Sequence, residues 1–221
     1  MAIVNNNNQL INVQALKQGR TKEQCAIIDY FTANGGCMGP KPMSDEQFMK
    51  ILKDKIVSLG IDNKSLNKLG IDIDEVQEIQ PVTFAGYDFA NQKSLAKRCN
   101  DGKWRCSGYQ ITKIYFSDKQ IYFYQYSFDL TNDSVFEFTD EYFYKDVTNF
   151  SSGLETVEKA VFNSAGGCMG AGIAQKFEQV QYSSFRLVVP GDIKKCSMNT
   201  SDEIETAIRG MKSKLREKKG E

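Results

Sequence analysis

Residues 121–128 read Ile121-Tyr122-Phe123-Tyr124-Gln125-Tyr126-Ser127-Phe128, a run dense in aromatic side chains. Alternation with a period of two places the tyrosines and Phe128 on one face and Ile121, Phe123 and Gln125 on the other. Aromatic and β-branched side chains suit a pleated, half-buried strand. Pairing with aromatic residues of the preceding stretch explains the aromatic density without a nucleic-acid ligand. We therefore predict a strand inside an antiparallel sheet.

The same alternation recurs on both sides of this stretch. Tight-turn sequences, Ser117-Asp118-Lys119-Gln120 and Thr131-Asn132-Asp133-Ser134, separate the expected strands and suit antiparallel neighbours. A series of about seven short strands favours an antiparallel meander, folded either as a barrel or as a bent sandwich. The expected strands cover residues 82–89, 109–117, 121–130, one or two strands within 135–150, and then 156–162, 176–182, 185–189 and 193–198.

Helical spacing replaces alternation before residue 81. Ser44 and Gln47 form a capping box that begins a helix, and a shorter helix is expected over residues 22–31. The phrase Leu-Gly-Ile-Asp occurs at 59–62 and again at 69–72. In each copy the glycine is expected to end one helix and the aspartate to cap the next. The predicted domains are therefore 1–80, partly irregular with short helices from about residue 44, and a strand-rich domain, 81–221.

A final helix is expected after the last strand. Residues 200–203 have the capping-box pattern, and an apolar stripe follows at Ile204, Ile208, Met211 and Leu215. Acidic side chains lie at the start of this helix and basic ones near its end, which complements the helix dipole. We favour this local explanation of the basic C-terminus over a membrane-binding segment.

Three stretches carry a family resemblance: residues 141–150, EYFYKDVTNF; residues 185–192, FRLVVPGD; and residues 208–212, IRGMK. Together with the order of the expected elements, they resemble an uncharacterised bacterial protein family with a pleckstrin-homology-like domain, over residues 81–219. The resemblance implies an α+β fold, an antiparallel bent barrel of about seven strands closed by the C-terminal helix and preceded by a small helical region. A fold by itself assigns no activity.

A basic loop between the first two expected strands is the candidate ligand site. Its basic members are Lys93, Lys97, Arg98, Lys103 and Arg105. In phosphoinositide-binding pleckstrin-homology domains the corresponding loop holds a lysine and then a basic residue, any residue and arginine; Lys93 with Lys103-Trp104-Arg105 is similar to that pattern. Lysine supplies mobile charge, and arginine supplies a planar fork for phosphate oxygens. Trp104 is the candidate membrane contact. The alternative is a loop of solvated charges.

Composition excludes several classes of function. The 221 residues contain no histidine, which excludes Ser-His-Asp and Cys-His catalysis and histidine-ligated zinc or haem. Because 28 basic side chains balance 28 acidic ones, we expect no nucleic-acid partner. No run reaches the roughly 20 apolar residues of a membrane helix, and the first residues lack a basic n-region. We therefore expect a cytoplasmic protein with no transmembrane segment.

The six cysteines show no Cys-x-x-Cys spacing, so we expect no metal and no cofactor. The phrase Gly-Gly-Cys-Met-Gly occurs at residues 35–39 and again at 166–170. Two glycine-rich surface loops are the favoured explanation of this repeat. A soft contact between the two loops and a disulfide between Cys37 and Cys168 are the alternatives.

These observations predict a function without a catalytic residue, since no nucleophile has a recognisable base beside it. We predict a non-enzymatic binding or adaptor module of the bacterial cytoplasm, which holds a protein partner through loop surfaces or a sheet edge. The alternative is peripheral membrane or anionic-ligand binding, with the Lys93–Arg105 loop holding the phosphate headgroup of an anionic lipid.

Overall fold

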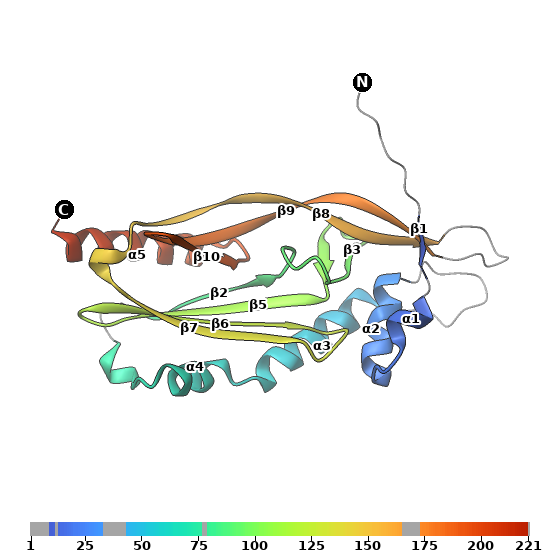
Figure 1. Ribbon diagram of the computed structural model, residues 1–221, viewed down its shortest axis with the longest axis horizontal. Coiled ribbons are helices and arrows are strands. Elements are labelled where there is room, and N and C mark those ends of the chain that lie inside the picture. Colours follow the sequence, from blue (N-terminus) through green and yellow to red (C-terminus); the bar gives the residue numbers. More distant parts are fainter. Residues whose placement is uncertain (1–8, 12, 33–42, 77–78, 165–172, 221) are drawn as a thin grey trace, which may run out of the picture.

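The computed structural model describes residues 9–11, 13–32, 43–76, 79–164 and 173–220. These residues form an elongated molecule with two four-stranded antiparallel sheets, one above the other, a separate two-stranded hairpin, and helices beneath the lower sheet (Figure 1). The predicted α+β class, with antiparallel sheets and a C-terminal helix, is confirmed. The two Gly-Gly-Cys-Met-Gly phrases, with Cys37 and Cys168, lie outside the described residues.

Four antiparallel strands, which we call the central sheet, form the middle layer in the order β2-β5-β6-β7. The aromatic stretch is β6, which pairs with β5 on one side and β7 on the other, so the predicted inner strand is confirmed. Tyr115 stands opposite Tyr122, which is the expected aromatic pairing. The strands are β2 (Val82–Tyr87), β5 (Gly108–Phe116), β6 (Gln120–Asp129) and β7 (Val135–Phe143).

Short helices cover one face of the central sheet. The predicted capping box at Ser44 and Gln47 is present at the start of α3. The cap at Asp62 was predicted wrongly: α4 follows Gly60, whose φ of 53° lets the helix begin at once and leaves Asp62 inside the first turn. Asp72 is the N-cap residue of η1, as predicted, although its side chain makes no cap bond. The helices are α1 (Val13–Lys17), α2 (Lys22–Thr32), α3 (Asp45–Ser58), α4 (Ile61–Leu69) and the 3-10 helix η1 (Ile73–Glu75).

A long hairpin dominates the upper layer, which we call the hairpin sheet. Its strands β8 and β9 pair along their whole length, so the strands expected over 176–182 and 185–189 are parts of one strand. β10 and β1 pair with the other side of β9, and the 3-10 helix η2 connects β7 to β8. The elements are η2 (Tyr144–Asp146), β8 (Asn149–Ser164), β9 (Ile173–Val189), β10 (Asp192–Ser197) and β1 (Gln9–Ile11).

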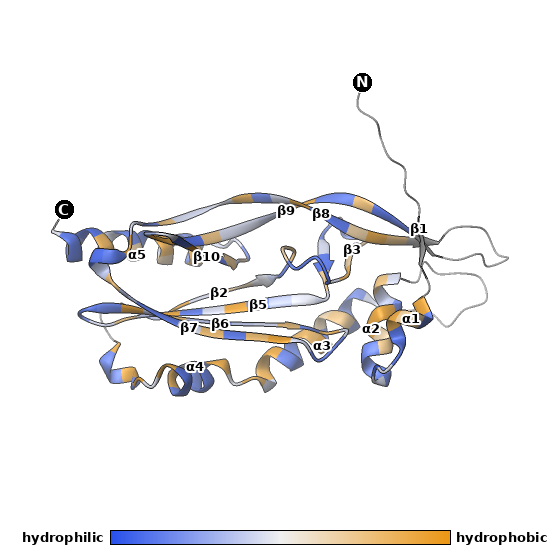
Figure 2. Ribbon diagram, viewed as in Figure 1, coloured by the Kyte–Doolittle hydropathy of each residue, from blue (hydrophilic) through white to orange (hydrophobic). Residues whose placement is uncertain are grey.

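Two hydrophobic clusters pack against opposite faces of the central sheet. Between the sheets, Phe185 stacks on Phe84 with ring centroids 4.3 Å apart and on Phe150 at 5.8 Å. On the helical side, Phe48 of α3 and Tyr30 of α2 belong to the cluster that contains the β5 and β6 aromatics. Figure 2 shows the corresponding alternation of hydrophobic and hydrophilic residues along the strands and helices. The N-terminal helices therefore share a core with the central sheet.

The C-terminal helix α5 (Asp202–Lys219) packs against the cluster between the sheets. Ile208, Met211 and Leu215 are buried there, as the apolar stripe predicts. The N-cap is Ser201, one residue later than expected, because its oxygen accepts from the Ile204 N–H. The Thr200 hydroxyl donates instead to Ser183, which withdraws it from the cap.

The β8–β9 hairpin buries opposite faces at its two ends. Near its base, Phe150 and Phe185 face the central sheet. Toward its tip, Val157 and Val180 lie on the other face of the hairpin and pack against Phe89. The right-handed twist of a long two-stranded ribbon accounts for this exchange of faces.

The two sheets do not close into the predicted bent barrel. Where the chain passes from β10 across β2, the Asn199 N–H donates to the Ala85 carbonyl, but the described residues form no β2–β10 ladder. A Cβ on Gly86 would lie 3.0 Å from the Met198 nitrogen, so the backbones cross at close range instead of pairing. The described strands, β1 to β10, also exceed the roughly seven expected. The unexpected ones are β1 and the hairpin of β3 (Ala96–Arg98) and β4 (Trp104–Cys106), which occupies the predicted basic loop.

Candidate functional site

The β3–β4 hairpin divides the predicted anion-binding residues between two faces. Lys97 stands opposite Arg105, and Arg98 stands opposite Trp104. Directly opposite residues of an antiparallel pair project to the same face. Lys97 and Arg105 therefore share one face, Arg98 lies on the other, and these cations do not converge on one phosphate.

Lys97 and Arg105 are engaged by the N-terminal helices and the hairpin itself. The Lys97 ammonium donates to the Tyr30 carbonyl at 3.2 Å and lies 4.2 Å from the centroid of the Tyr30 ring. Arg105 makes a two-pronged bond to Asp101 at 3.0 and 3.1 Å and lies 3.8 Å from a carboxylate oxygen of Asp45. The bond from Arg105 lowers the pKa of Asp101 to about 2. These two cations therefore hold the hairpin against α2 and α3.

Lys93, Arg98 and Lys103 remain at the surface. Arg98 Nε donates to the Gly102 carbonyl at 3.4 Å, and within the described ranges none of the three forms an ion pair with a carboxylate. Trp104 is half-buried and packs against the cluster of Phe89 and Val180. The predicted set is thus reduced to three outward cations.

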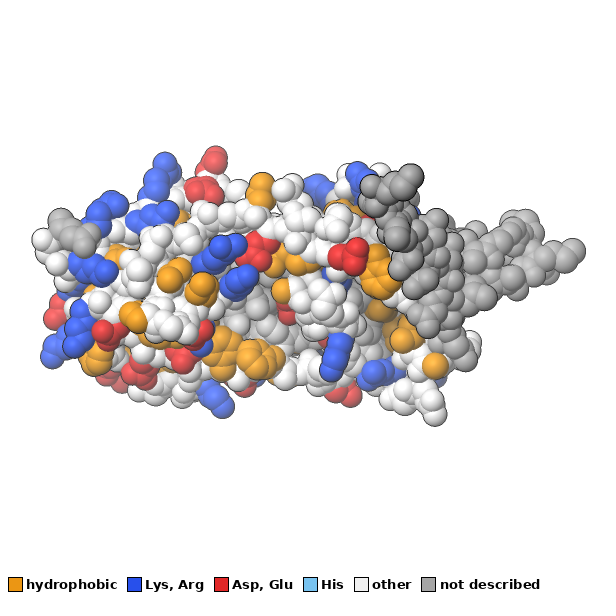
Figure 3. Space-filling model, turned by 45° about the horizontal axis from the view of Figure 1, so that its top comes forward, with side chains coloured by type: hydrophobic (Ala, Val, Ile, Leu, Met, Phe, Trp, Pro, Cys, Tyr) orange, Lys and Arg blue, Asp and Glu red, His pale blue; other side chains and the backbone are white. Residues whose placement is uncertain are grey.

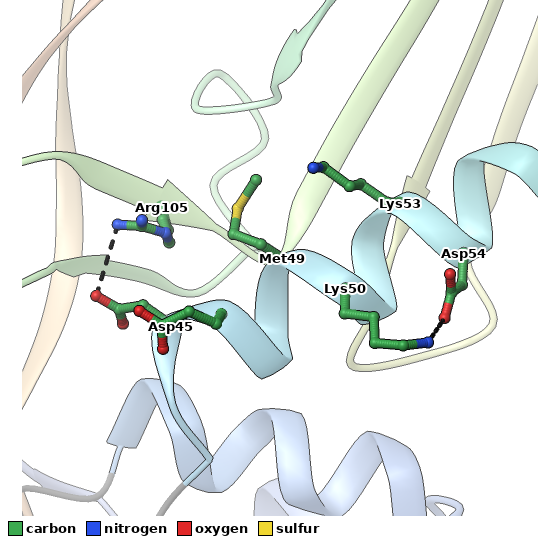
Figure 4. A pocket seen from close by; sticks show the side chains of 7 residues that line it. Asp45, Met49, Lys50, Lys53, Asp54 and Arg105 are labelled. Atoms are coloured by element: carbon green, nitrogen blue, oxygen red, sulfur yellow. Dashed lines mark hydrogen bonds and ion pairs between the residues drawn. The ribbon is translucent and has the colours of Figure 1, made fainter.

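A depression of about 390 Å³ lies beside Arg105 at the start of α3 (Figure 4). Lys50 pairs with Asp54 at 2.6 Å, and Arg105 pairs with Asp45. Because these charges are already balanced by one another, we do not take the depression as the functional site. It is lined by Asp45, Glu46, Met49, Lys50, Lys53, Asp54 and Arg105.

A second pocket, of about 380 Å³, lies where β6 leads into β7, and we call it the β6–β7 pocket. Along β6 the face toward the hairpin sheet changes from apolar at Phe123 to polar at Gln125, Ser127 and Asp129. The polar end of that face forms the wall of the pocket, and the loop after β2 forms another. The lining residues are Asp88, Ala90, Asn91, Gln110, Gln125, Ser127, Phe128, Asp129, Ser134, Val135 and Phe136.

The two carboxylates of this pocket differ in their hydrogen bonds. Asp129 accepts from the Ser107 hydroxyl at 2.9 Å on one oxygen, and from the Thr131 N–H at 2.8 Å and the Thr131 hydroxyl at 2.5 Å on the other. Asp88 accepts from the Asn91 N–H at 3.3 Å, and a weaker interaction with the Ala90 backbone also favours its charged form. Burial raises the pKa of Asp88. Asp88 is therefore the carboxylate with acceptor capacity left for a ligand.

Lys159 of β8 lies beside the pocket and is completely buried. Its ammonium donates to the Asn91 carbonyl at 2.6 Å. Burial lowers the pKa of Lys159, while Asp88 and Asp129 act in the opposite direction by favouring its charged form. Our sequence reasoning missed this residue, although Val157 and Val161 at a spacing of two on either side place Lys159 on an apolar face.

The outer edge of β7 borders the same pocket. Val135 and Phe136 line the pocket and still expose 53% and 60% of their surface, and Phe143 at the other end of the strand is also exposed. In the view of Figure 3, hydrophobic side chains border a hollow near the middle of the molecule, among scattered charges of both signs. Within residues 121–144 no lysine or arginine occurs, and the acidic residues are Asp129, Asp133, Glu137, Asp140 and Glu141. The β7 edge is therefore aromatic and acidic.

The described residues hold no group of three or more Cys, Asp or Glu side chains placed to bind a metal ion. The cysteines within them, Cys25, Cys99, Cys106 and Cys196, are free thiols. Burial raises the pKa of the Cys106 and Cys196 thiols to about 12, so neither supplies a thiolate nucleophile at neutral pH.

None of the helices in the described ranges is long and apolar enough to cross a membrane. No protein-family model matches the chain, and no curated protein or solved structure matches it. The geometry of the β7 edge and of the β6–β7 pocket is therefore the basis for assigning a function.

Proposed function

We propose that the chain is a non-enzymatic binding module that holds an extended segment of a partner protein as an added strand on β7. The observation that supports this proposal is the free outer edge of β7. Among the described strands, β7 pairs only with β6. The Asp129 N–H donates to the Ser134 carbonyl, so these two residues form a hydrogen-bonded pair. From there, non-hydrogen-bonded and hydrogen-bonded pairs alternate along β6 and β7. Thr139 and Tyr124 form a non-hydrogen-bonded pair, so the N–H and C=O of Thr139 point away from β6. They can therefore bond to an incoming strand.

Charge and exposed apolar surface indicate the chemistry of the partner. Glu137 already pairs with Lys64 at 3.6 Å and Asp140 with Lys194 at 2.9 Å, so Glu141 is the β7 carboxylate that forms no ion pair within the described ranges, and it favours a basic residue in the docked segment. The exposed Val135, Phe136 and Phe143 favour apolar side chains. A second copy of this chain would instead bring Glu137 and Glu141 against identical acids, which disfavours edge-to-edge pairing of two copies. We therefore commit to a basic, apolar strand of another protein.

The order of elements supports a pleckstrin-homology-like domain. A four-stranded sheet is followed by β8, β9 and β10 and then by α5, which packs between the sheets. The free thiols support the reducing bacterial cytoplasm as the setting. Both assignments belong to the proposal.

Blocking the β7 edge tests the proposed function. Random displayed peptides are selected on the intact protein, and the dissociation constant of an enriched synthetic peptide is measured by fluorescence polarisation. Thr139→Pro removes the outward N–H while leaving the bonds to β6. We expect this variant to weaken the peptide at least about tenfold. The control variant Thr139→Val keeps the edge N–H and is expected to bind like the native chain.

Hydrogen exchange gives a second readout of the same complex. The amides of Glu137, Thr139 and Glu141 face outward, so they should exchange quickly in the free protein and slowly in the complex. Failure to enrich any peptide, equal binding by Thr139→Pro, or unchanged exchange at these amides would each contradict strand addition on β7. A shift to dimers with rising concentration, lost in Thr139→Pro, would assign the edge to a second copy of this chain instead.

A second candidate function is anion binding through the outward cations Lys93, Arg98 and Lys103, which have no ion-pair partner in the described part of the chain. If they bind phosphate headgroups, the native chain should co-sediment with vesicles containing phosphatidylserine at low salt and less at physiological salt. Changing the three to Glu should abolish the binding, whereas changing the exposed Lys53, Lys55 and Lys68 to Glu should reduce it only slightly. No binding, or equal loss in both triple variants, rejects a site on the hairpin.

A further inference from the structure

We infer that the β6–β7 pocket receives a basic side chain, a guanidinium in preference to an ammonium, from the strand that docks on β7. This inference rests on the proposed function and names the residue type that the partner must supply. It assigns the pocket a role in specificity, while the edge of β7 supplies main-chain bonds that any extended sequence can make.

The position of the pocket along β7 brings a docked side chain within reach. Phe136 belongs to β7 and lines the pocket, and Val135, the first residue of the strand, stands opposite Phe128, which lines it as well. A strand added to β7 would pass directly beside this opening. Its side chains near Val135 would therefore enter the pocket from the edge.

The net charge of the pocket and its surroundings is negative, which favours a cationic ligand. Asp88 and Asp129 contribute two carboxylates, and Lys159 contributes one ammonium, which is already bonded to the Asn91 carbonyl. No described cation lies within ion-pair distance of Asp88. A basic side chain would bring the two carboxylates and two cations into balance and give Asp88 a charge-assisted partner in a partly desolvated site.

Polar groups around Asp88 have bonding capacity that the chain itself does not use. The buried Ser94 hydroxyl has no hydrogen-bond partner within the described ranges. It lies beside Asp88, over Gly108, in the space that a Cβ of Gly108 would fill. The Ser127 hydroxyl, which lines the pocket, also makes no hydrogen bond to another described residue. Ser94 itself does not line the pocket, but Asp88 and Ser127 do, and two acceptors at different angles suit the five donors of a guanidinium better than a single ammonium.

The ring of Phe136 completes the site. Phe136 stands opposite Ser127, lines the pocket and is exposed, whereas the Phe128 ring packs against Tyr109 and Tyr126 on the helical side of the sheet. A planar guanidinium stacks on an aromatic face, and the contact gains strength when water is excluded. Carboxylate, hydroxyl and ring therefore match three different surfaces of one arginine side chain.

A two-by-two comparison tests the inference with the selected peptide. The protein carries Asp88 or the isosteric Asp88→Asn, and the peptide carries arginine or the neutral isostere citrulline at its basic position. We expect Asp88→Asn to weaken the arginine peptide at least about tenfold and to leave the citrulline peptide unchanged. Glu141→Gln removes one negative charge from β7 outside the pocket and should weaken the peptide less than about threefold. Phe136→Ala removes an exposed ring and leaves every charge of the pocket in place. It should also weaken binding of the arginine peptide.

The results separate the two proposals. Equal binding of the arginine peptide by the native chain and Asp88→Asn, with binding still lost in Thr139→Pro, overturns the pocket inference and keeps strand addition. Selected peptides without a recurring arginine or lysine overturn it as well. Retained binding in Thr139→Pro together with loss in Asp88→Asn would leave a pocket that recognises a basic group and would reject the added strand.

Discussion

Replacing Phe185 by Ala is expected to lower the free energy of unfolding by about 4 kcal/mol and the melting temperature by roughly 8–16 °C. Phe185 is fully buried and stacks on Phe84 of the central sheet and on Phe150 of β8. Its removal leaves a cavity between the two sheets that neither ring can fill without leaving its partner. Urea and thermal unfolding followed by circular dichroism measure the effect.

Phe177 provides a control on the same strand. It is 55% exposed, so Phe177→Ala removes the same atoms from β9 with little change in burial. We expect a change of less than about 1 kcal/mol. Equal losses in Phe185→Ala and Phe177→Ala would show that the stacking between the sheets does not stabilise the molecule.

Replacing Lys159 by Met is expected to destabilise the protein by about 3 kcal/mol at neutral pH. The methionine keeps most of the buried volume but leaves the Asn91 carbonyl without its donor and Asp88 without its nearby positive charge. Burial already raises the pKa of Asp88, and loss of Lys159 should raise it further. Urea unfolding at several pH values measures the difference between the two proteins.

The pH dependence distinguishes charge from packing. A carboxyl with a raised folded-state pKa costs stability as the pH rises through that pKa, and costs nothing below its unfolded value of 3.8. The deficit of Lys159→Met should therefore be largest near pH 7 and should shrink as the pH falls toward 4. Lys195→Met, at an exposed lysine paired with Glu155, should change stability by less than about 1 kcal/mol at either pH. If Lys159→Met lowered the free energy of unfolding equally at both pH values, Lys159 would stabilise the protein through packing and not through its charge.

Local patterns predicted most of the elements. The Ser44 capping box, the stripe through Ile208 and Met211 and the alternation along β6 each depend on residues close together in sequence, and each was found in place. The barrel was predicted wrongly because closure depends on the angle at which the chain after β10 crosses β2 near Gly86, which no local spacing encodes. The β8–β9 hairpin buries the face of Phe150 near its base and the opposite face, with Val157, toward its tip. Alternation in the sequence shows that both faces are apolar but not where along the hairpin each one is buried.

The candidate site was harder to predict than the fold. The charges of the basic loop were visible in sequence, but the register that pairs Lys97 with Arg105 is set by a hairpin. Its turn signal, Asn100-Asp101-Gly102, is present in the sequence and was not used to predict the hairpin. The β6–β7 pocket joins the loop after β2 to β6 and β7, so it exists only after the sheet has formed. The sequence does contain one usable signal, the absence of lysine and arginine from residues 121–144.

The sharing of a core between the N-terminal helices and the central sheet has a consequence for synthesis on the ribosome. Phe48 and Leu52 of α3 leave the exit tunnel before the β5 and β6 residues that bury them have been translated. At elongation rates of about 5–20 residues per second, this apolar helix face waits for several seconds without its partner. Nascent chains stalled before β5 should therefore recruit chaperones through α2 and α3, and chains long enough to expose β6 should release them.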